Sequence, residues 1–543
     1  MKKSVVVCVL FTLLAGISKA QTVALTSSNL PIIYINTNGQ TIPNEPKITA
    51  DMGIVYNGVG ARNNSTDPLN HYNGKIGIEI RGQSSQMFPM KSYTIELRDA
   101  AGNDIEQPLF GLPKEADWVL YAPYTDKTLM RNFLAYTISR SLGNWAANTR
   151  FVELVLNNEY KGVYVFMEKI ERSNGRLGLS KMAATDISGD AVTGGYIFSL
   201  DKQPNGWFSR YPAPNANNSN TRQFSYVYPK PEDIVQPQKD YIKSYVDAFE
   251  DALYGAQFQD PLNGVRKYAD VTSFIDYFIV NEISRNVDGY RLSSYFHKDR
   301  DSKRTKIYAG PVWDYDLAFR NADYCSGSYT TGWAYQFNYV CPGDGAGLIP
   351  FWWNRFMEDT AFVRDLRCRW KEKRQTVLSE ERLLFLIDSA AGLLNEAQQR
   401  HFTRWPILGQ YVWPNPQPLA ANYNQEIAYL KAWISARLTW IDENIPNKGT
   451  CSDYPSDRVE SVLISIAPNP VSAASVIRIQ SKLAQNIEWQ VLDISGRILQ
   501  TRKVTLKAGT NNFALNAGGW SAGVYALRFQ TGTGERFVFR VVR

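Results

Sequence analysis

The chain has 543 residues, of which 44% are hydrophobic and 20% charged, and its formal net charge is +7. This length accommodates two or three domains, each with a full core. The positive charge is dispersed, without a basic run or an arginine-rich helix, which argues against a nucleic-acid-binding protein.

The N-terminus has the pattern of a secretory signal peptide. Lys2 and Lys3 precede a mostly apolar run over residues 5–17, and Ser18-Lys19-Ala20 forms a small-x-small cleavage site. We therefore expect residues 1–20 to be removed and the mature chain to be exported. No later apolar run approaches the ~20 residues of a membrane helix, so no transmembrane segment is expected in the mature chain.

Four cysteines follow the predicted cleavage site: Cys325, Cys341, Cys368 and Cys451. In an exported protein an even number favours two disulfides, whereas their spacing does not resemble that of a zinc site. The loop-like stretch between Cys325 and Cys341 favours a bond between these two, but the sequence leaves the connectivity open.

The first half of the mature chain is predicted to be rich in strands. Residues 21–74 contain short apolar runs between turns, and residues 75–97 form a β-hairpin. The hairpin turn, residues 82–85, can present backbone N–H groups and hydroxyls to an anion, and Lys91 begins the returning strand. The alternative is an ordinary hairpin with a surface lysine.

One helix and four further strands are expected next. Thr125 or Asp126 can cap a helix over residues 128–142, whose apolar positions recur at helical spacing. The predicted strands span residues 117–120, 150–156, 163–170 and 194–201. The Asn- and Pro-rich residues 203–220 are expected to form a surface loop.

Helices dominate the second half of the predicted structure, and a long loop covers residues 324–349. The apolar periodicity indicates helices over residues 241–253, 271–285, 351–357, 362–376, 379–397 and 423–444. Residues 307–313 are the exception, since their short, β-branched run predicts a buried strand.

Three carboxylates lie at the ends of these segments. Asp288 follows the helix over residues 271–285, and Asp314 and Asp316 follow the predicted strand over residues 307–313. Carboxylate oxygens are the ligands of Mg²⁺ and Ca²⁺, so the Asp-x-Asp pair predicts a site for a hard cation. The alternatives are turn caps or a structural Ca²⁺ site for the pair, and a simple turn residue for Asp288.

The C-terminal segment changes character. After a linker over residues 447–458, short alternating strands and regular turns over residues 459–543 predict a small β-sandwich. Its sequence contains IAPNP at 466–470, VLDISGR at 491–497, AGTN at 508–511 and SAGVYALR at 521–528. These motifs resemble the C-terminal sorting domain of the type IX secretion system of Bacteroidetes. The resemblance implies an encounter with that secretion machinery and a secreted or cell-surface location.

The central region also resembles a known family. Five blocks carry the resemblance: IRGQSSQMFPMKSY at 80–93, DWVLYAPYTDKTLMRN at 117–132, RFVELVLNNEYKGVYVFMEKI at 150–170, NVDGY at 286–290 and GPVWDYDLAF at 310–319. Together they look like the CotH family of atypical protein kinases. The resemblance implies an α+β, two-lobe domain with a β-rich small lobe and a helical large lobe over residues 75–446.

The resemblance also implies roles for individual residues. Asp288 would be the base that orients the acceptor hydroxyl, and Asp314 and Asp316 would bind Mg²⁺ or Mn²⁺. Gly82, Ser84 and Ser85 would cover the phosphates of ATP, and Lys91 would reach them. Glu168 lies where a hinge to the nucleotide base would run, and Arg131 would pair with a phosphate or with a carboxylate.

Two departures from a kinase are visible. Ser293 stands where kinases carry a metal-binding Asn, so Asn286 or Asn321 would have to supply an amide, and the helix over residues 128–142 has no Glu to pair with Lys91.

Three classes of function follow from these observations. The first is ATP- and metal-dependent phosphoryl transfer to a protein substrate, and the second is an inactive surface protein or adhesin. The third is a glycan-binding or glycan-active protein, suggested by the aromatic residues Trp333, Tyr335, Trp352, Trp353, Trp405 and Trp413, for which core packing is the commoner role.

Overall fold

The computed structural model describes most of the chain after the predicted signal peptide, which lies outside the described residues. The described residues are 23–202, 204–215, 221–341, 347–447, 449–451, 462–467, 471–481, 483–493, 497–521, 523–531 and 536–543. Most of the predicted linker also lies outside them.

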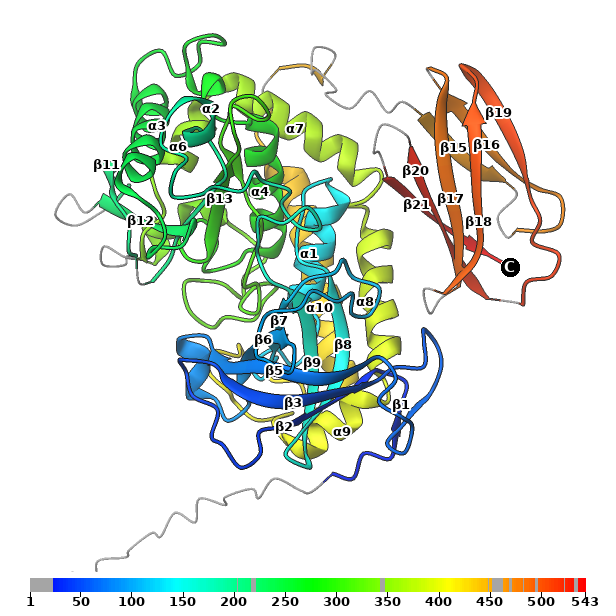
Figure 1. The fold of residues 1–543 in the computed structure, drawn as a ribbon. Helices are drawn as coiled ribbons and strands as arrows, with labels where there is room; N and C mark the ends of the chain where they lie inside the picture. The colour runs from blue at the N-terminus through cyan, green and yellow to red at the C-terminus, as the bar shows by residue number, and fades with distance from the viewer. Residues whose placement is uncertain are drawn as a thin grey trace, which may run out of the picture.

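A closed β-barrel forms the first part of the fold (Figure 1). Its strand order is β2-β3-β5-β6-β7-β9-β8, and the parallel pair β2–β8 closes it. The strands are β2 (Ile32–Asn36), β3 (Ile48–Val55), β5 (Tyr72–Arg81), β6 (Ser92–Arg98), β7 (Asp117–Tyr121), β8 (Thr149–Leu156) and β9 (Glu159–Glu168). The predicted hairpin is therefore confirmed as β5 and β6.

Alternation of apolar residues explains the barrel core. In the register of β5 and β6, Ile78 lies opposite Ile95 and Ile76 opposite Leu97, and all four side chains are fully buried. Side chains two residues apart share one face of a strand, so both strands point these residues inward. Because β2 and β3 complete the same barrel, the boundary predicted at residue 75 falls inside β5 and does not separate two domains.

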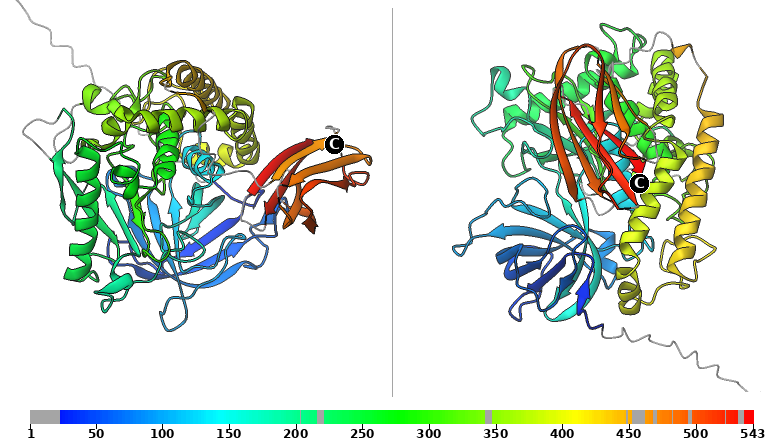
Figure 2. Two further views of the ribbon diagram at one scale, coloured as in Figure 1. Left: turned by 90° about the horizontal axis from the view of Figure 1, so that it is seen from above. Right: turned by 90° about the vertical axis from the view of Figure 1, so that its right-hand side faces the viewer.

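A helical region follows the barrel. Its long helices are α1 (Arg131–Ser141), α3 (Gln236–Tyr254), α4 (Val271–Ser284), α6 (Trp352–Glu358), α7 (Thr360–Arg374), α8 (Glu380–Leu394), α9 (Ala397–Arg404) and α10 (Tyr423–Asn444). Helix α4 is the buried centre of this region, and α8 and α10 run side by side (Figure 2). Helix α9 reaches the barrel, where His401 Nδ1 accepts a hydrogen bond of 3.1 Å from the backbone N–H of Val163.

An antiparallel sheet lies within the helical region and carries part of the site. Its order is β11-β12-β10-β13-β14, with β11 (Phe208–Pro212), β12 (Thr221–Tyr228), β10 (Tyr196–Leu200), β13 (Ser294–Lys298) and β14 (Tyr308–Ala309). β11 lies within the segment predicted as a loop over residues 203–220. β14 is shorter than the predicted strand, because Gly310 has a left-handed φ of 105° and Pro311 has no N–H for a ladder.

The C-terminal strands form two facing sheets with a core of their own, as predicted. The sheets are β15-β16-β19 and β18-β17-β20-β21. The strands are β15 (Val462–Ala467), β16 (Ser475–Ser481), β17 (Gln485–Asp493), β18 (Ile498–Leu506), β19 (Gly509–Leu515), β20 (Val524–Thr531) and β21 (Arg536–Val542). Trp489, Leu527 and Phe529 are fully buried between the sheets.

Two disulfides are present. Cys325 pairs with Cys341, as the sequence indicates, and Cys368 on α7 pairs with Cys451. No helix among the described residues is both long and apolar enough to cross a membrane.

Candidate functional site

The connection between β5 and β6 forms a tight turn. Gly82 has a left-handed φ of 95°, a conformation that favours glycine. Ser84–Met87 form a short 3₁₀ helix. The amino group of Lys91 donates to the carbonyl oxygens of Gln86 and, at 2.7 Å, of Phe88. In this structure the amino group of Lys91 therefore stabilises the turn. The sequence predicted instead that it would contact phosphates.

Helix α1 holds the segment that contains Asp314 and Asp316. The backbone N–H of Asp314 donates to the hydroxyl of Tyr136 at 3.1 Å, and that of Tyr315 donates to Asn132 Oδ1 at 2.6 Å. Asp314 itself has a left-handed φ of 63°. A non-glycine residue adopts this conformation only where its surroundings impose it, and such residues gather at functional sites.

The loop after α4 presents Asp288, whose side chain is 17% exposed. Asn286 ties this loop to the neighbouring segment, because its Oδ1 accepts from the backbone N–H of Asp288 at 3.2 Å and its Nδ2 donates to the carbonyl of Asp314 at 3.4 Å. The amide of Asn321 likewise donates to the carbonyl of Asp316 at 2.8 Å. Both amides therefore brace the backbone around the carboxylates.

A fourth carboxylate, Asp201, joins this group from the end of β10. Its Oδ1 accepts the backbone N–H of Lys202 at 2.8 Å, and a further hydrogen bond comes from the backbone N–H of Ser293. Burial raises the pKa of Asp201, and the negative charge of Asp288 raises it further. The two hydrogen bonds lower it, but by less. Asp201 thus contacts Ser293, the position at which the resemblance to kinases predicts a metal-binding Asn.

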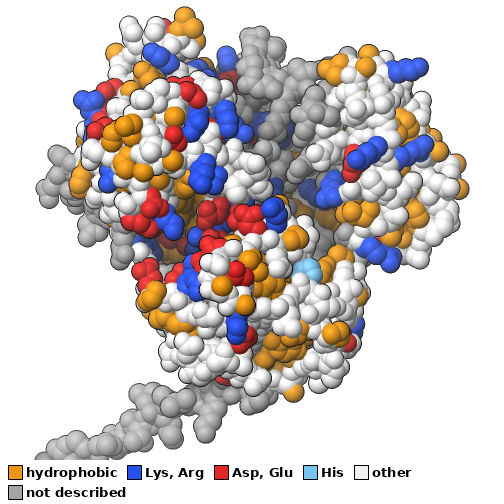
Figure 3. Space-filling view, viewed as in Figure 1, with side chains coloured by type: hydrophobic (Ala, Val, Ile, Leu, Met, Phe, Trp, Pro, Cys, Tyr) orange, Lys and Arg blue, Asp and Glu red, His pale blue; other side chains and the backbone are white. Residues whose placement is uncertain are grey.

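Burial and neighbouring carboxylates raise the pKa values of Asp201, Asp314 and Asp316. Burial and then the charge of Asp288 raise the pKa of Asp314 to about 6, although water reaches its side chain. Burial and then the charges of Asp314 and Asp288 raise the pKa of Asp316 well above its ordinary value, while a hydrogen bond from Tyr121 opposes the increase. Figure 3 shows acidic side chains gathered along the boundary between the barrel and the helical region.

Two cations, Arg81 and Lys202, act on Asp314 in this acidic cluster, which we define as Asp201, Asp288, Asp314 and Asp316. The positive charges of Arg81 and Lys202 both lower the pKa of Asp314. Lys202 also donates from Nζ to Ser84 Oγ at 2.9 Å, and so connects the β5–β6 turn to the end of β10. The acidic cluster, the turn and the two cations therefore lie together.

The donor chemistry of the acidic cluster fits a hard divalent cation, because carboxylate oxygens are its preferred ligands. Among the described residues, no three carboxylate, imidazole or thiolate side chains converge closely enough to form a ready-made metal-binding group. Mg²⁺ commonly takes only one or two protein carboxylates and completes its shell with phosphate oxygens and water. The cluster is therefore suited to a cation that arrives with a phosphate ligand.

Two predicted nucleotide contacts have other partners. Arg131 is 1% exposed and forms ion pairs with Asp126 at 2.5 Å and Glu426 at 3.2 Å. Of its two predicted partners, a phosphate or a carboxylate, the structure shows carboxylates. Glu168 is fully buried, and its Oε2 accepts from the backbone and side-chain amides of Asn148 at 2.7 and 2.9 Å. Both side chains stabilise the fold in this structure.

The aromatic residues that suggested glycan binding are mostly part of the core. Trp352, Trp353 and Trp405 are buried, and Trp333 and Tyr335 pack against the core. Only Trp413 among the six is exposed, at 43%, and its ring stacks on that of Tyr324. A cavity of about 480 Å³ lies between the end of α1, the start of α4 and β14, but none of the four carboxylates of the acidic cluster lines it.

Sequence reasoning missed five members of this site, of which Arg81 directly precedes the predicted turn. Asp201 follows an apolar strand as Asp314 does, and this shared pattern was the available signal. Lys202 is its neighbour, while Asn132 and Tyr136 are polar side chains on the buried face of α1. Their contacts are between segments far apart in the chain, which local patterns do not report.

The fold and the acidic cluster define an α+β protein whose barrel turn faces carboxylates of a helical region. Residues 78–441, two thirds of the 543-residue chain, match the family model described as CotH kinase protein. The chain therefore belongs to the CotH family. Residues 465–542 match the secretion system C-terminal sorting domain, which indicates export through the type IX machinery and a secreted or cell-surface location. No curated protein matches the chain.

Proposed function

We propose that this CotH-family protein is a metal- and ATP-dependent phosphotransferase whose acceptor is a hydroxyl group of a protein substrate. The observation that carries the proposal is the acidic cluster facing Arg81, Lys202 and the β5–β6 turn. Phosphoryl transfer requires charge neutralisation on the phosphates, a bridging cation and a base that orients the acceptor. The site has side chains suited to each requirement.

The order of elements supports a kinase-like assignment of two lobes. A turn between strands, helix α1, the strands β8 and β9, helix α4, the Asp288 loop and the Asp314 segment follow one another as the corresponding parts do in protein kinases. In this assignment the barrel is the small lobe, and Asn132 and Tyr136 couple α1 to the metal-binding segment. That coupling takes the place of the Lys–Glu ion pair of kinases.

We assign the individual roles as follows. Asp316 and Asp314 would hold Mg²⁺ or Mn²⁺, which neutralises phosphate charge when bound. Asp201 would supply the carboxylate ligand that compensates for Ser293. Asp288 would orient the acceptor hydroxyl and accept its proton.

Phosphate contacts are assigned to the residues around the turn. Gly82, Ser84 and Ser85 would offer backbone N–H groups and hydroxyls, and Arg81 and Lys202 would meet the phosphate charge. Lys91 would keep the turn in shape. The two cations therefore replace Lys91 in its predicted role.

The test is incubation of the mature protein with labelled ATP and Mg²⁺ or Mn²⁺. We expect labelling of an acceptor protein, lost in the Asp288→Asn and Asp316→Asn variants and retained in Asp233→Asn, which changes an exposed aspartate. Ser293 is the observation that favours the alternative, an inactive surface protein. If the wild-type protein labels no acceptor and MgATP does not raise its melting temperature, the protein is an inactive surface protein and the proposed function fails.

A further inference from the structure

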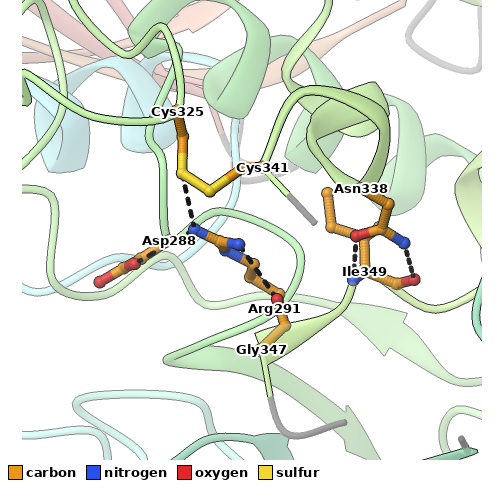
Figure 4. The surroundings of a disulfide bond; sticks show 7 residues. All are labelled: Asp288, Arg291, Cys325, Asn338, Cys341, Gly347 and Ile349. Carbon is orange, nitrogen blue, oxygen red and sulfur yellow. Dashed lines mark hydrogen bonds and ion pairs between the residues drawn. A yellow bond between two sulfur atoms is a disulfide. The ribbon is translucent and has the colours of Figure 1, made fainter. Parts of the chain in front are cut away.

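Arg291 lies between the acidic cluster and the disulfide Cys325–Cys341 (Figure 4). It belongs to the loop after α4, three residues beyond Asp288, and its side chain is only 7% exposed. A buried guanidinium needs partners for its charge and its five N–H groups, so its contacts indicate what it does there.

Arg291 contacts both the Cys325–Cys341 disulfide and Asp288. Its Nη1 donates to the carbonyl of Gly347 at 3.0 Å. Its Nη2 lies 3.9 Å from Cys325 Sγ and 4.0 Å from Asp288 Oδ1. Among the described residues, Asp288 is the one carboxylate within ion-pair distance of Arg291. One guanidinium nitrogen is thus shared between the disulfide and the proposed base.

A second buried arginine shows that this placement carries an electrostatic cost. Arg222 donates from Nη2 to the carbonyl of Arg291 at 2.6 Å, and burial together with the charge of Arg291 lowers the pKa of Arg222. Two buried cations side by side repel each other unless carboxylates oppose them. Asp201 opposes Arg222, and Asp288 opposes Arg291.

We propose that Arg291 is a positioning residue for Asp288, and that the Cys325–Cys341 disulfide keeps Arg291 in place. The inference rests on the proposed function, because it assigns Arg291 the task of orienting the base. The planar guanidinium is fixed by the Gly347 carbonyl and the Cys325 sulfur, and its Nη2 lies at ion-pair distance from the Asp288 carboxylate, which its charge orients. The disulfide thereby acts on the reaction centre without touching the substrate.

The kinetic test compares Arg291→Gln and Arg291→Lys with wild type in the phosphoryl-transfer assay. We expect Arg291→Gln to lower kcat by up to ~100-fold, since small misplacements of a reacting group have effects of this size, while KM for ATP changes by less than about twofold. Arg291→Lys should recover part of kcat because it keeps the charge. A rise in KM with unchanged kcat, or no recovery with lysine, would overturn the assignment.

The disulfide is tested with the double variant Cys325→Ser/Cys341→Ser. It should lower kcat in the same direction as Arg291→Gln, and combining both changes should add little. The matched control removes the other disulfide through Cys368→Ser/Cys451→Ser, which should lower the melting temperature and leave kcat unchanged. Equal losses of kcat from both disulfide variants would show a general effect of stability and refute the proposal.

Hydrogen exchange separates this inference from the proposed function. We expect the backbone amides of residues 286–293 to exchange faster in Arg291→Gln and in Cys325→Ser/Cys341→Ser, and to remain protected in Cys368→Ser/Cys451→Ser. If wild type transfers no phosphate, the proposed function fails and this measurement alone decides the positioning role. Unchanged exchange in either of the first two variants would refute it.

Discussion

Replacing Asp314 by asparagine should stabilise the metal-free protein while removing its response to metal and nucleotide. The side chain of Asp314 is held as a carboxylate among like charges, and asparagine removes that charge with almost no change in volume. Asparagine also tolerates the left-handed φ of 63° at this position at least as well as aspartate. The change therefore relieves repulsion without straining the backbone.

The size of the effect follows from the pKa of Asp314. Its increase from 3.8 to about 6 corresponds to about 3 kcal/mol at a pH above both values. Water reaches the side chain and screens it, so we halve this figure to ~1.5 kcal/mol. Because the folded pKa is raised, the ionised form destabilises the fold, and the penalty grows as pH rises from about 4 to about 6 and is absent below that window.

Thermal unfolding in EDTA at pH 7.5 and pH 4 tests this reasoning. Asp314→Asn should melt about 2 °C above wild type at pH 7.5 and at the wild-type temperature at pH 4. MgATP should raise the melting temperature of wild type but not of the variant. The control Asp233→Asn should match wild type throughout. A variant that melts below wild type in EDTA at pH 7.5 would refute the account of crowded carboxylates.

Three further predictions concern other parts of the molecule. Burial lowers the pKa of His401 to about 3, so wild type should lose ~1.4 kcal/mol per pH unit as pH falls from 6.5, and His401→Asn should lose less in urea titrations at each pH. Arg131→Met leaves two buried carboxylates unpaired and should cost ~3–5 kcal/mol by denaturant titration, against ~0.5 kcal/mol or less for the exposed Arg497→Met. Lys202→Gln should weaken MgATP binding about tenfold by calorimetry, which is the effect of losing one charged contact. Lys91→Gln should chiefly lower the melting temperature. Weaker MgATP binding in Lys91→Gln and a lower melting temperature in Lys202→Gln would contradict our assignment.

Local patterns predicted the elements whose stability is encoded locally. Helix α10 has the predicted bounds, and α4 ends one residue earlier than expected, because long apolar periodicity specifies a helix. The predicted helix over residues 379–397 is α8, which ends at Leu394, and α9, which begins at Ala397, was not predicted. Membership of β2 in the barrel depends on pairing with β8, more than a hundred residues away, and no local signal encodes it.

In the site as well, the residues next to local elements were predicted and the contacts between distant segments were not. Asp288, Asp314 and Asp316 were predicted because each follows a recognisable element, and the structure brings them together. The orientation of Lys91 depends on two carbonyl groups of its own turn. The approach of Lys202 to Ser84 spans 118 positions of the chain, so it required the folded structure.

The parallel pair β2–β8 has a consequence for how the protein can be shortened. The CotH match begins at residue 78, whereas the barrel needs β2 and β3, which precede it. A chain that began at residue 78 would lack the strands β2 and β3 and most of β5. The backbone N–H and C=O groups of β8 and β6 would then be unpaired at open sheet edges. Such edges recruit other chains, so the truncated protein should aggregate, and the residues that precede the CotH match are necessary for the barrel to close.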